Sequence, residues 1–126
     1  MADEKSQVLQ DLVERAVGMV RKLRSAKEAY MGQLWQDSPQ PIAEQCQLLI
    51  QALKDILETC KNIETVGGSH DKFTIIRALA EKSIASLETQ QKRGVAKEPA
   101  PDLLNDLQTI DTTLGTMHNW YLSWIT

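Results

Sequence analysis

The side-chain types most often used in catalysis are few in this sequence, and their spacing limits what they can do. Ser69, His70 and Asp71 supply the three side-chain types of a hydrolase triad, but they are consecutive. Consecutive residues at the start of a helix point in different directions, so they cannot align as nucleophile, base and orienting acid. A helix N-cap at Ser69, with Asp71 in the first turn, explains the run better. We therefore expect no catalytic residue here.

Cofactor and metal sites are not indicated by the remaining candidates. Met117 and His118 are adjacent, and adjacent helical residues point about 100° apart, so the two cannot ligate one haem iron. Neither His70 nor His118 has a Glu three residues before it, as the di-iron sites of helical bundles require. Glycine-rich phosphate loops and the H-E-x-x-H zinc motif do not occur. The sequence predicts a protein that is not an enzyme and has no cofactor and no metal.

The two cysteines, Cys46 and Cys60, lie in one stretch of helical periodicity. Their separation corresponds to about 21 Å along a helix, whereas a disulfide needs Cα atoms within about 7 Å. The same distance prevents them from sharing a metal ion. We expect two buried, reduced thiols and, because the N-terminus lacks a secretory-signal pattern, a cytoplasmic location.

Four cations lie within residues 21–27. The expected topology brings two more, from the helix over residues 70–93, toward the same end of the bundle. Such a run is usually a solvated helix face, but it also suits an anionic lipid headgroup or a phosphorylated ligand. The net charge of −3 argues against nucleic acid, and a membrane surface is possible but not favoured. The candidate anion-binding residues are Arg21, Lys22, Arg24, Lys27, Lys92 and Arg93.

The C-terminal turn, residues 120–125, is apolar nearly all round. It can plug the end of the bundle, anchor a partner protein, or pack against chain beyond residue 126. If Trp120→Ala or Leu122→Ala weakens partner binding without unfolding the domain, the turn anchors a partner. If either substitution unfolds the domain, the turn plugs the bundle end. The candidate partner-binding residues are Trp120, Leu122, Trp124 and Ile125.

The elements that must position these residues are helices, and the clearest covers residues 41–66. Apolar side chains recur there at steps of four and three, which places them on one helical face. We call such a line of side chains a seam. This seam comprises Ile42, Cys46, Leu49, Leu53, Ile56, Cys60 and Ile63.

Three further seams predict helices over residues 3–36, 70–93 and 102–125. The first is interrupted by Lys27, beside which Ala26 can fill the space. Helix boundaries are predicted at Pro39 and Pro41, at Gly67 and Gly68, and at Asp102 as an N-cap. In the third helix Ile75 and Leu79 are expected to widen the buried face, and Ala78, Ala80 and Ala85 to make it rich in small residues. The main face itself is expected to comprise Phe73, Ile76, Ala80, Ile84 and Leu87.

Four matched seams with mostly short connections predict an all-α fold, an antiparallel up-down-up-down four-helix bundle with heptad-like packing and a single domain over residues 1–126. An apolar core of this kind leaves little with which to build a catalytic site. We expect a non-catalytic adaptor or scaffold that binds a partner helix or peptide, in a groove between two helices or at the Trp-rich end. The oligomeric state stays open.

Overall fold

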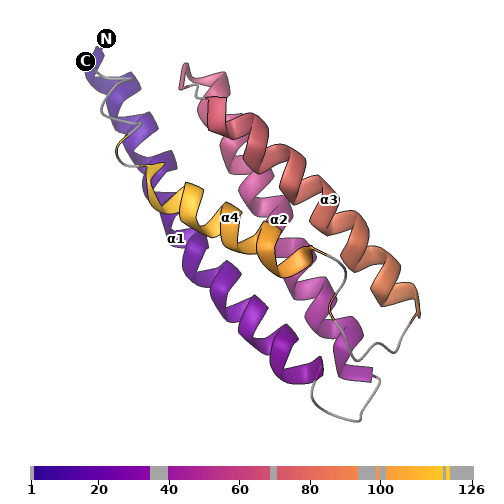
Figure 1. The fold of residues 1–126 in the computed structure, drawn as a ribbon. Helices are drawn as coiled ribbons and strands as arrows, with labels where there is room; N and C mark the ends of the chain where they lie inside the picture. The colour runs from indigo at the N-terminus through magenta and orange to yellow at the C-terminus, as the bar shows by residue number, and fades with distance from the viewer. Residues whose placement is uncertain are drawn as a thin grey trace.

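The computed structural model describes residues 2–34, 40–68, 71–93, 99, 102–117 and 119, and the side chains of 4, 6–33, 43–68 and the later described residues. These residues form four helices and no strand (Figure 1). The all-α prediction is confirmed. The helices are α1 Ala2–Leu34, α2 Gln40–Thr65, α3 Asp71–Arg93 and α4 Leu103–Gly115.

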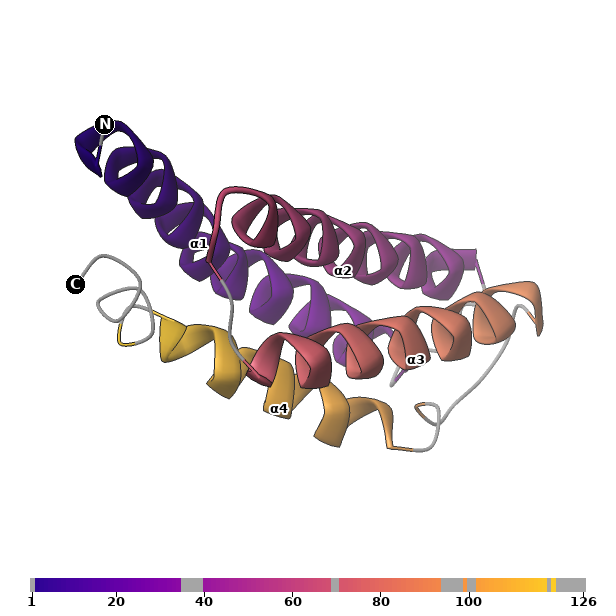
Figure 2. The same cartoon turned by 90° about the horizontal axis from the view of Figure 1, so that it is seen from above.

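The helices form an antiparallel bundle in which each packs against the next along the chain, and α4 returns to α1. Seen from above, α2 and α4 lie on opposite sides of the core (Figure 2). The first turns of α1 extend past the end of α2 in the same view. This arrangement confirms the predicted up-down-up-down bundle.

The predicted seams supply the core. On α1 the half-buried Lys27 interrupts the seam as expected, and Ala26 packs partly against the core beside it. Ile42 lies outside the described side chains. The buried seam residues of α1 and α2 are Leu9, Val13, Ala16, Val20, Leu23, Tyr30, Cys46, Leu49, Leu53, Ile56, Cys60 and Ile63.

The end of α2 follows from its glycines. Gly67 has φ 102°, a left-handed conformation that L side chains rarely adopt. The N–H of Gly68 donates to the carbonyl of Ile63 at 2.9 Å, and that of Gly67 to the carbonyl of Glu64 at 3.2 Å. These two bonds are the Schellman pattern, which satisfies carbonyls left over at a helix end. The predicted stop at these glycines is confirmed.

The predicted side-chain cap on α4 is wrong. Asp102 precedes the helix, but it is left-handed (φ 64°) and its side chain makes no capping hydrogen bond. Its carboxylate lies 3.6 Å from the ammonium of Lys82 instead. The helix also ends at Gly115, earlier than predicted, with Thr116 donating to the carbonyl of Thr113 at 3.2 Å. Residues 118 and 120–126 lie outside the described residues.

The main face of α3 is buried as predicted, at Phe73, Ile76, Ala80, Ile84 and Leu87, and Leu79 packs partly against the core beside it. The other expected margins of this face differ. Ile75 is 46% exposed, and Ala78 and Ala85 are also exposed, so they neither widen nor line the core. Two polar residues complete the buried line at steps of three and four, because these positions face the core whatever side chain they carry. That line comprises Phe73, Ile76, Ala80, Ser83, Leu87 and Gln90.

Candidate functional site

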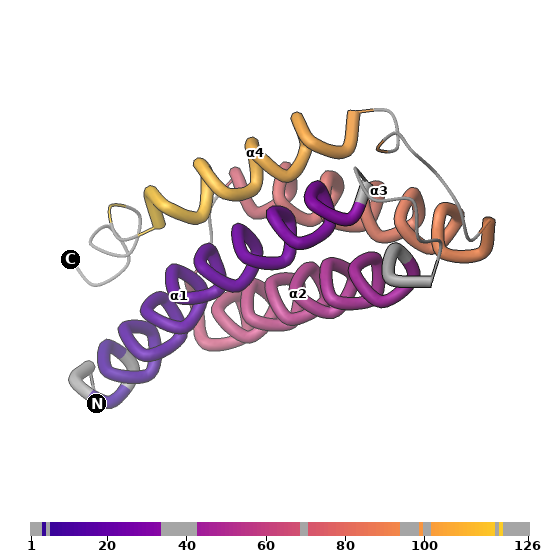
Figure 3. Tube along the Cα trace, turned by 90° about the horizontal axis from the view of Figure 1, so that it is seen from below, coloured from indigo at the N-terminus to yellow at the C-terminus, as the bar shows by residue number. Residues whose placement is uncertain are grey.

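A groove of about 580 Å³ runs along the outside of the contact between α1 and α2. These two helices lie side by side when the bundle is seen from below (Figure 3). The groove is open to solvent along its length and mostly apolar in lining. Its lining residues are Arg21, Lys22, Ser25, Ala26 and Ala29 on α1, and Leu48, Gln51, Ala52 and Asp55 on α2.

Small side chains explain why a groove forms here. Ala26 and Ala29 on α1 face Ala52 on α2 across the groove. An alanine projects one methyl group, so packed backbones leave a hollow that larger residues would fill. Leu48 borders this hollow and is 54% exposed. The site therefore combines a shallow apolar floor with one large aliphatic side chain in solvent.

The two walls of the groove carry opposite charge. Arg21 and Lys22 are exposed on the α1 side, and neither forms an ion pair with any residue that the structure describes. Asp55 lies on the α2 side, where its Oδ1 accepts a hydrogen bond from Nε2 of Gln51 at 3.0 Å. Among the described residues, these two cations thus have no ion-pair partner at the groove.

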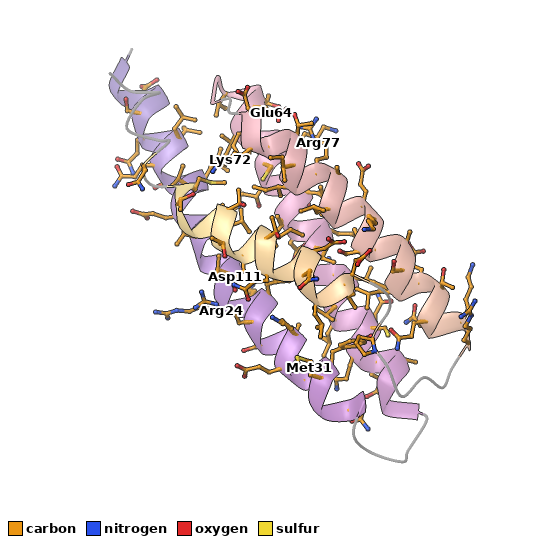
Figure 4. The ribbon with its side chains drawn as sticks, in the orientation of Figure 1. Arg24, Met31, Glu64, Lys72, Arg77 and Asp111 are labelled. Carbon is orange, nitrogen blue, oxygen red and sulfur yellow. The ribbon has the colours of Figure 1, made fainter. Side chains whose placement is uncertain are left out.

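Each of the other three helix–helix contacts is joined by an ion pair between its two helices. Across the α1–α2 contact the described residues form none, and a weak hydrogen bond from Thr59 Oγ1 to Met19 Sδ at 3.6 Å is found instead. Figure 4 labels two of the pairs. The pairs are Arg24–Asp111 between α1 and α4, Lys82–Asp106 between α3 and α4, and Arg77–Glu64 between α2 and α3.

Arg24 belongs to the fold rather than to a free cationic patch. Its Nε donates to Asp111 Oδ2 at 2.7 Å and its Nη2 to Oδ1 at 2.9 Å, a bidentate pair. These hydrogen bonds, together with the charge of the carboxylate, raise the pKa of Arg24 above its usual value. Asp111 is 8% exposed, and no seam predicted it as a core residue. The sequence feature that could have indicated its burial is its position directly after Ile110, a seam residue.

The six predicted anion-binding residues are therefore not brought together. Lys92 and Arg93 end α3, which packs along α2 and α4 and meets α1 at the Tyr30–Gln90 hydrogen bond rather than along its length. Lys27 is half-buried, whereas Arg21 and Lys22 share the groove wall. The anion-binding alternative retains those two as a free pair.

The candidate partner-binding residues of the C-terminal turn lie outside the described residues and stay predictions. They are Trp120, Leu122, Trp124 and Ile125. His118, Ser69 and His70 also lie outside.

A second hollow, of about 370 Å³, lies at the α2–α3 contact. Its lining includes Lys61, Glu64, Arg77 and Glu81, so the two signs of charge balance. Glu64 and Arg77 already pair with each other (Figure 4). This hollow offers less apolar surface and less unpaired charge than the groove between α1 and α2.

Both cysteines are buried and form no disulfide. Burial raises the pKa of Cys46 to about 11 and, with a smaller contribution from the charge of Glu64, that of Cys60 to about 12. At neutral pH both are thiols rather than reactive thiolates. Among the described residues, no three His, Cys, Asp or Glu side chains are grouped closely enough to hold a metal ion.

Neither a protein-family model, nor a characterised protein, nor a solved structure matches this chain. None of the helices in the described part of the chain has both the length and the apolar content needed to cross a membrane.

Proposed function

We propose that this protein is a non-catalytic interaction domain, an adaptor or scaffold, that binds a helix of a partner protein in the groove between α1 and α2. The observation that carries the proposal is the exposed Leu48 beside a floor of small residues. Large aliphatic side chains in solvent gain free energy when a partner covers them. Small floor residues let a partner backbone approach closely enough to do so.

The dimensions of the groove suit a short helical contact. Its lining extends over about one heptad of each helix, from Arg21 to Ala29 on α1 and from Leu48 to Asp55 on α2. One heptad corresponds to about 10 Å, or two helical turns. A partner helix would contribute apolar residues at positions i, i+3 or i+4, and i+7, the spacing used in helix-in-groove recognition.

The test is a selection of displayed helical peptides against the whole protein, followed by binding measurements on variants. Selected peptides are expected to bind the wild type and to lose roughly tenfold or more in affinity for Leu48→Asp, because a carboxylate would be desolvated in the contact. Ile75→Asp is the matched control, since Ile75 is 46% exposed but lies on α3, outside the groove lining. Circular dichroism should show both variants folded.

Two results would contradict the proposal. One is a selection that enriches no helical peptide. The other is a set of peptides that bind Leu48→Asp as tightly as the wild type, which would place the contact elsewhere on the bundle.

A further inference from the structure

We infer that the partner helix carries acidic residues along the edge that lies over α1, where they meet Arg21 and Lys22. This inference rests on the proposed function, because it specifies the partner of the same groove. It commits to a helix from another protein whose apolar stripe is flanked on one side by Asp or Glu.

The first argument is that the charges at the groove have not been used by the fold. Arg24, on the neighbouring face of α1, holds Asp111 in a bidentate pair, and Lys82 lies 3.2 Å from Asp106. Arg21 and Lys22 have no such carboxylate among the described residues. The guanidinium of Arg21 and the ammonium of Lys22 thus remain available to an incoming acidic side chain.

The second argument is geometric. A helix seated in a groove between two antiparallel helices has one edge over each of them. The residues that flank its apolar stripe, equivalent to the e and g positions of a heptad, face those two helices. One edge meets Arg21 and Lys22, and the other meets Gln51 and Asp55. An acidic edge is favoured over α1 and disfavoured over α2, since Asp55 would repel it.

The charge pattern therefore also determines direction. Turning a helix end for end exchanges its two edges, so a partner with a single acidic edge fits in one direction only. Specificity of this kind uses both the attraction to Arg21 and Lys22 and the repulsion from Asp55.

The experiment uses three helical peptides with the same Leu and Ala stripe and Gln on one edge. The other edge carries Glu in the first peptide, Gln in the second and Lys in the third. Binding to the whole protein is measured by fluorescence anisotropy at low and high salt. The Glu peptide is expected to bind roughly three- to tenfold more tightly than the Gln peptide at low salt, and the Lys peptide more weakly than either. The advantage should shrink at high salt.

A matched pair of variants separates a local contact from the overall field of the protein. Arg21→Glu/Lys22→Glu should abolish the preference for the Glu peptide. Lys92→Glu/Arg93→Glu makes the same change in net charge at the end of α3, which lies outside the groove lining, and should leave the preference in place.

The outcomes distinguish the two proposals. Equal binding of all three peptides, or an equal effect of the two double variants, would overturn the acidic-edge inference and leave the groove as a docking site. Failure of all three peptides to bind would overturn both. Sedimentation of the wild type as a dimer that Leu48→Asp dissociates would also overturn both, because a second copy would then occupy the groove.

Discussion

At the scale of single residues, the two buried thiols link stability to alkaline pH. The pKa of each is raised by burial from an ordinary value of 9.0, to about 11 for Cys46 and about 12 for Cys60. Between pH 9 and these values the unfolded chain loses the thiol protons while the folded protein retains them. The folded state then binds more protons, so the free energy of unfolding falls as pH rises through this window and is unaffected by the thiols below it.

We therefore predict that urea denaturation will show decreasing stability above pH 9. Lysines and tyrosines also titrate there, so the measurement is the difference from Cys46→Ala/Cys60→Ala, whose stability should fall less steeply. Parallel profiles for the two proteins would show that the thiols do not contribute.

The Arg24–Asp111 pair is asymmetric in exposure, which predicts unequal effects of removing its members. The Arg24 side chain is 63% exposed and that of Asp111 is 11% exposed. Without Asp111, Arg24 remains hydrated; without Arg24, a mostly buried carboxylate remains unpaired. We expect Arg24→Met to lower the melting temperature more than Asp111→Asn does.

The double variant Arg24→Met/Asp111→Leu should recover much of the Arg24→Met loss, because apolar replacement of both partners leaves no buried charge. Thermal unfolding of all four proteins measures this. A larger effect of Asp111→Asn than of Arg24→Met would contradict the argument.

At the scale of the helices, replacing a glycine by alanine should stabilise the protein inside α1 and destabilise it at the end of α2. Gly18 lies inside α1, and a Cβ built there meets nothing within 4 Å. Gly18→Ala should stabilise the protein by about 0.5–1 kcal/mol, because alanine loses less backbone entropy in a helix. Gly67→Ala should destabilise it by about 1–2 kcal/mol, because Gly67 has φ 102°. Urea denaturation of the two variants checks both signs.

Some features of the helices could be predicted from the sequence, and others depend on packing between helices. The stop at Gly67 and the α2 seam follow from local rules, since turn chemistry and helical periodicity involve only nearby residues. The exposure of Ile75 and the burial of Ser83 and Gln90 on α3 do not. Ile75 and Ile76 are equally apolar, and packing against α2 and α4 decides that Ile76 is buried while Ile75 is 46% exposed. Asp102 likewise has a high capping propensity, yet it adopts a left-handed conformation and its carboxylate lies near Lys82 instead.

At the scale of the whole molecule, one buried hydrogen bond connects helices that are not neighbours in the bundle. The hydroxyl of Tyr30 on α1 donates to Oε1 of Gln90 on α3, and both residues are buried. Tyr30→Phe removes this donor and should cost about 1–2 kcal/mol of stability. Gln90→Leu removes the acceptor, and Tyr30→Phe/Gln90→Leu removes both partners of the bond. A double-mutant cycle by urea denaturation measures the coupling, and additive effects would contradict it.

The groove also belongs to this scale, and the sequence could not predict its location. Ala26, Ala29 and Ala52 are ordinary helical residues until α1 and α2 are placed side by side. The sequence predicted a groove between two unspecified helices, and it placed Arg21 and Lys22 among six candidate anion-binding cations. It could not separate them from Arg24, because the pairing of Arg24 with Asp111 joins the first helix to the last.

The order in which the helices contact one another has a kinetic consequence. Because each helix packs mainly on its successor, most tertiary contacts close short loops, and chains of this kind fold within microseconds to milliseconds. Contacts between α4 and α1 span nearly the entire chain, so the loop entropy they must overcome is the largest. We expect the hairpin of α1 and α2 to assemble early and α4 to dock late. The groove proposed to bind a partner helix would then be complete before the rest of the bundle has closed.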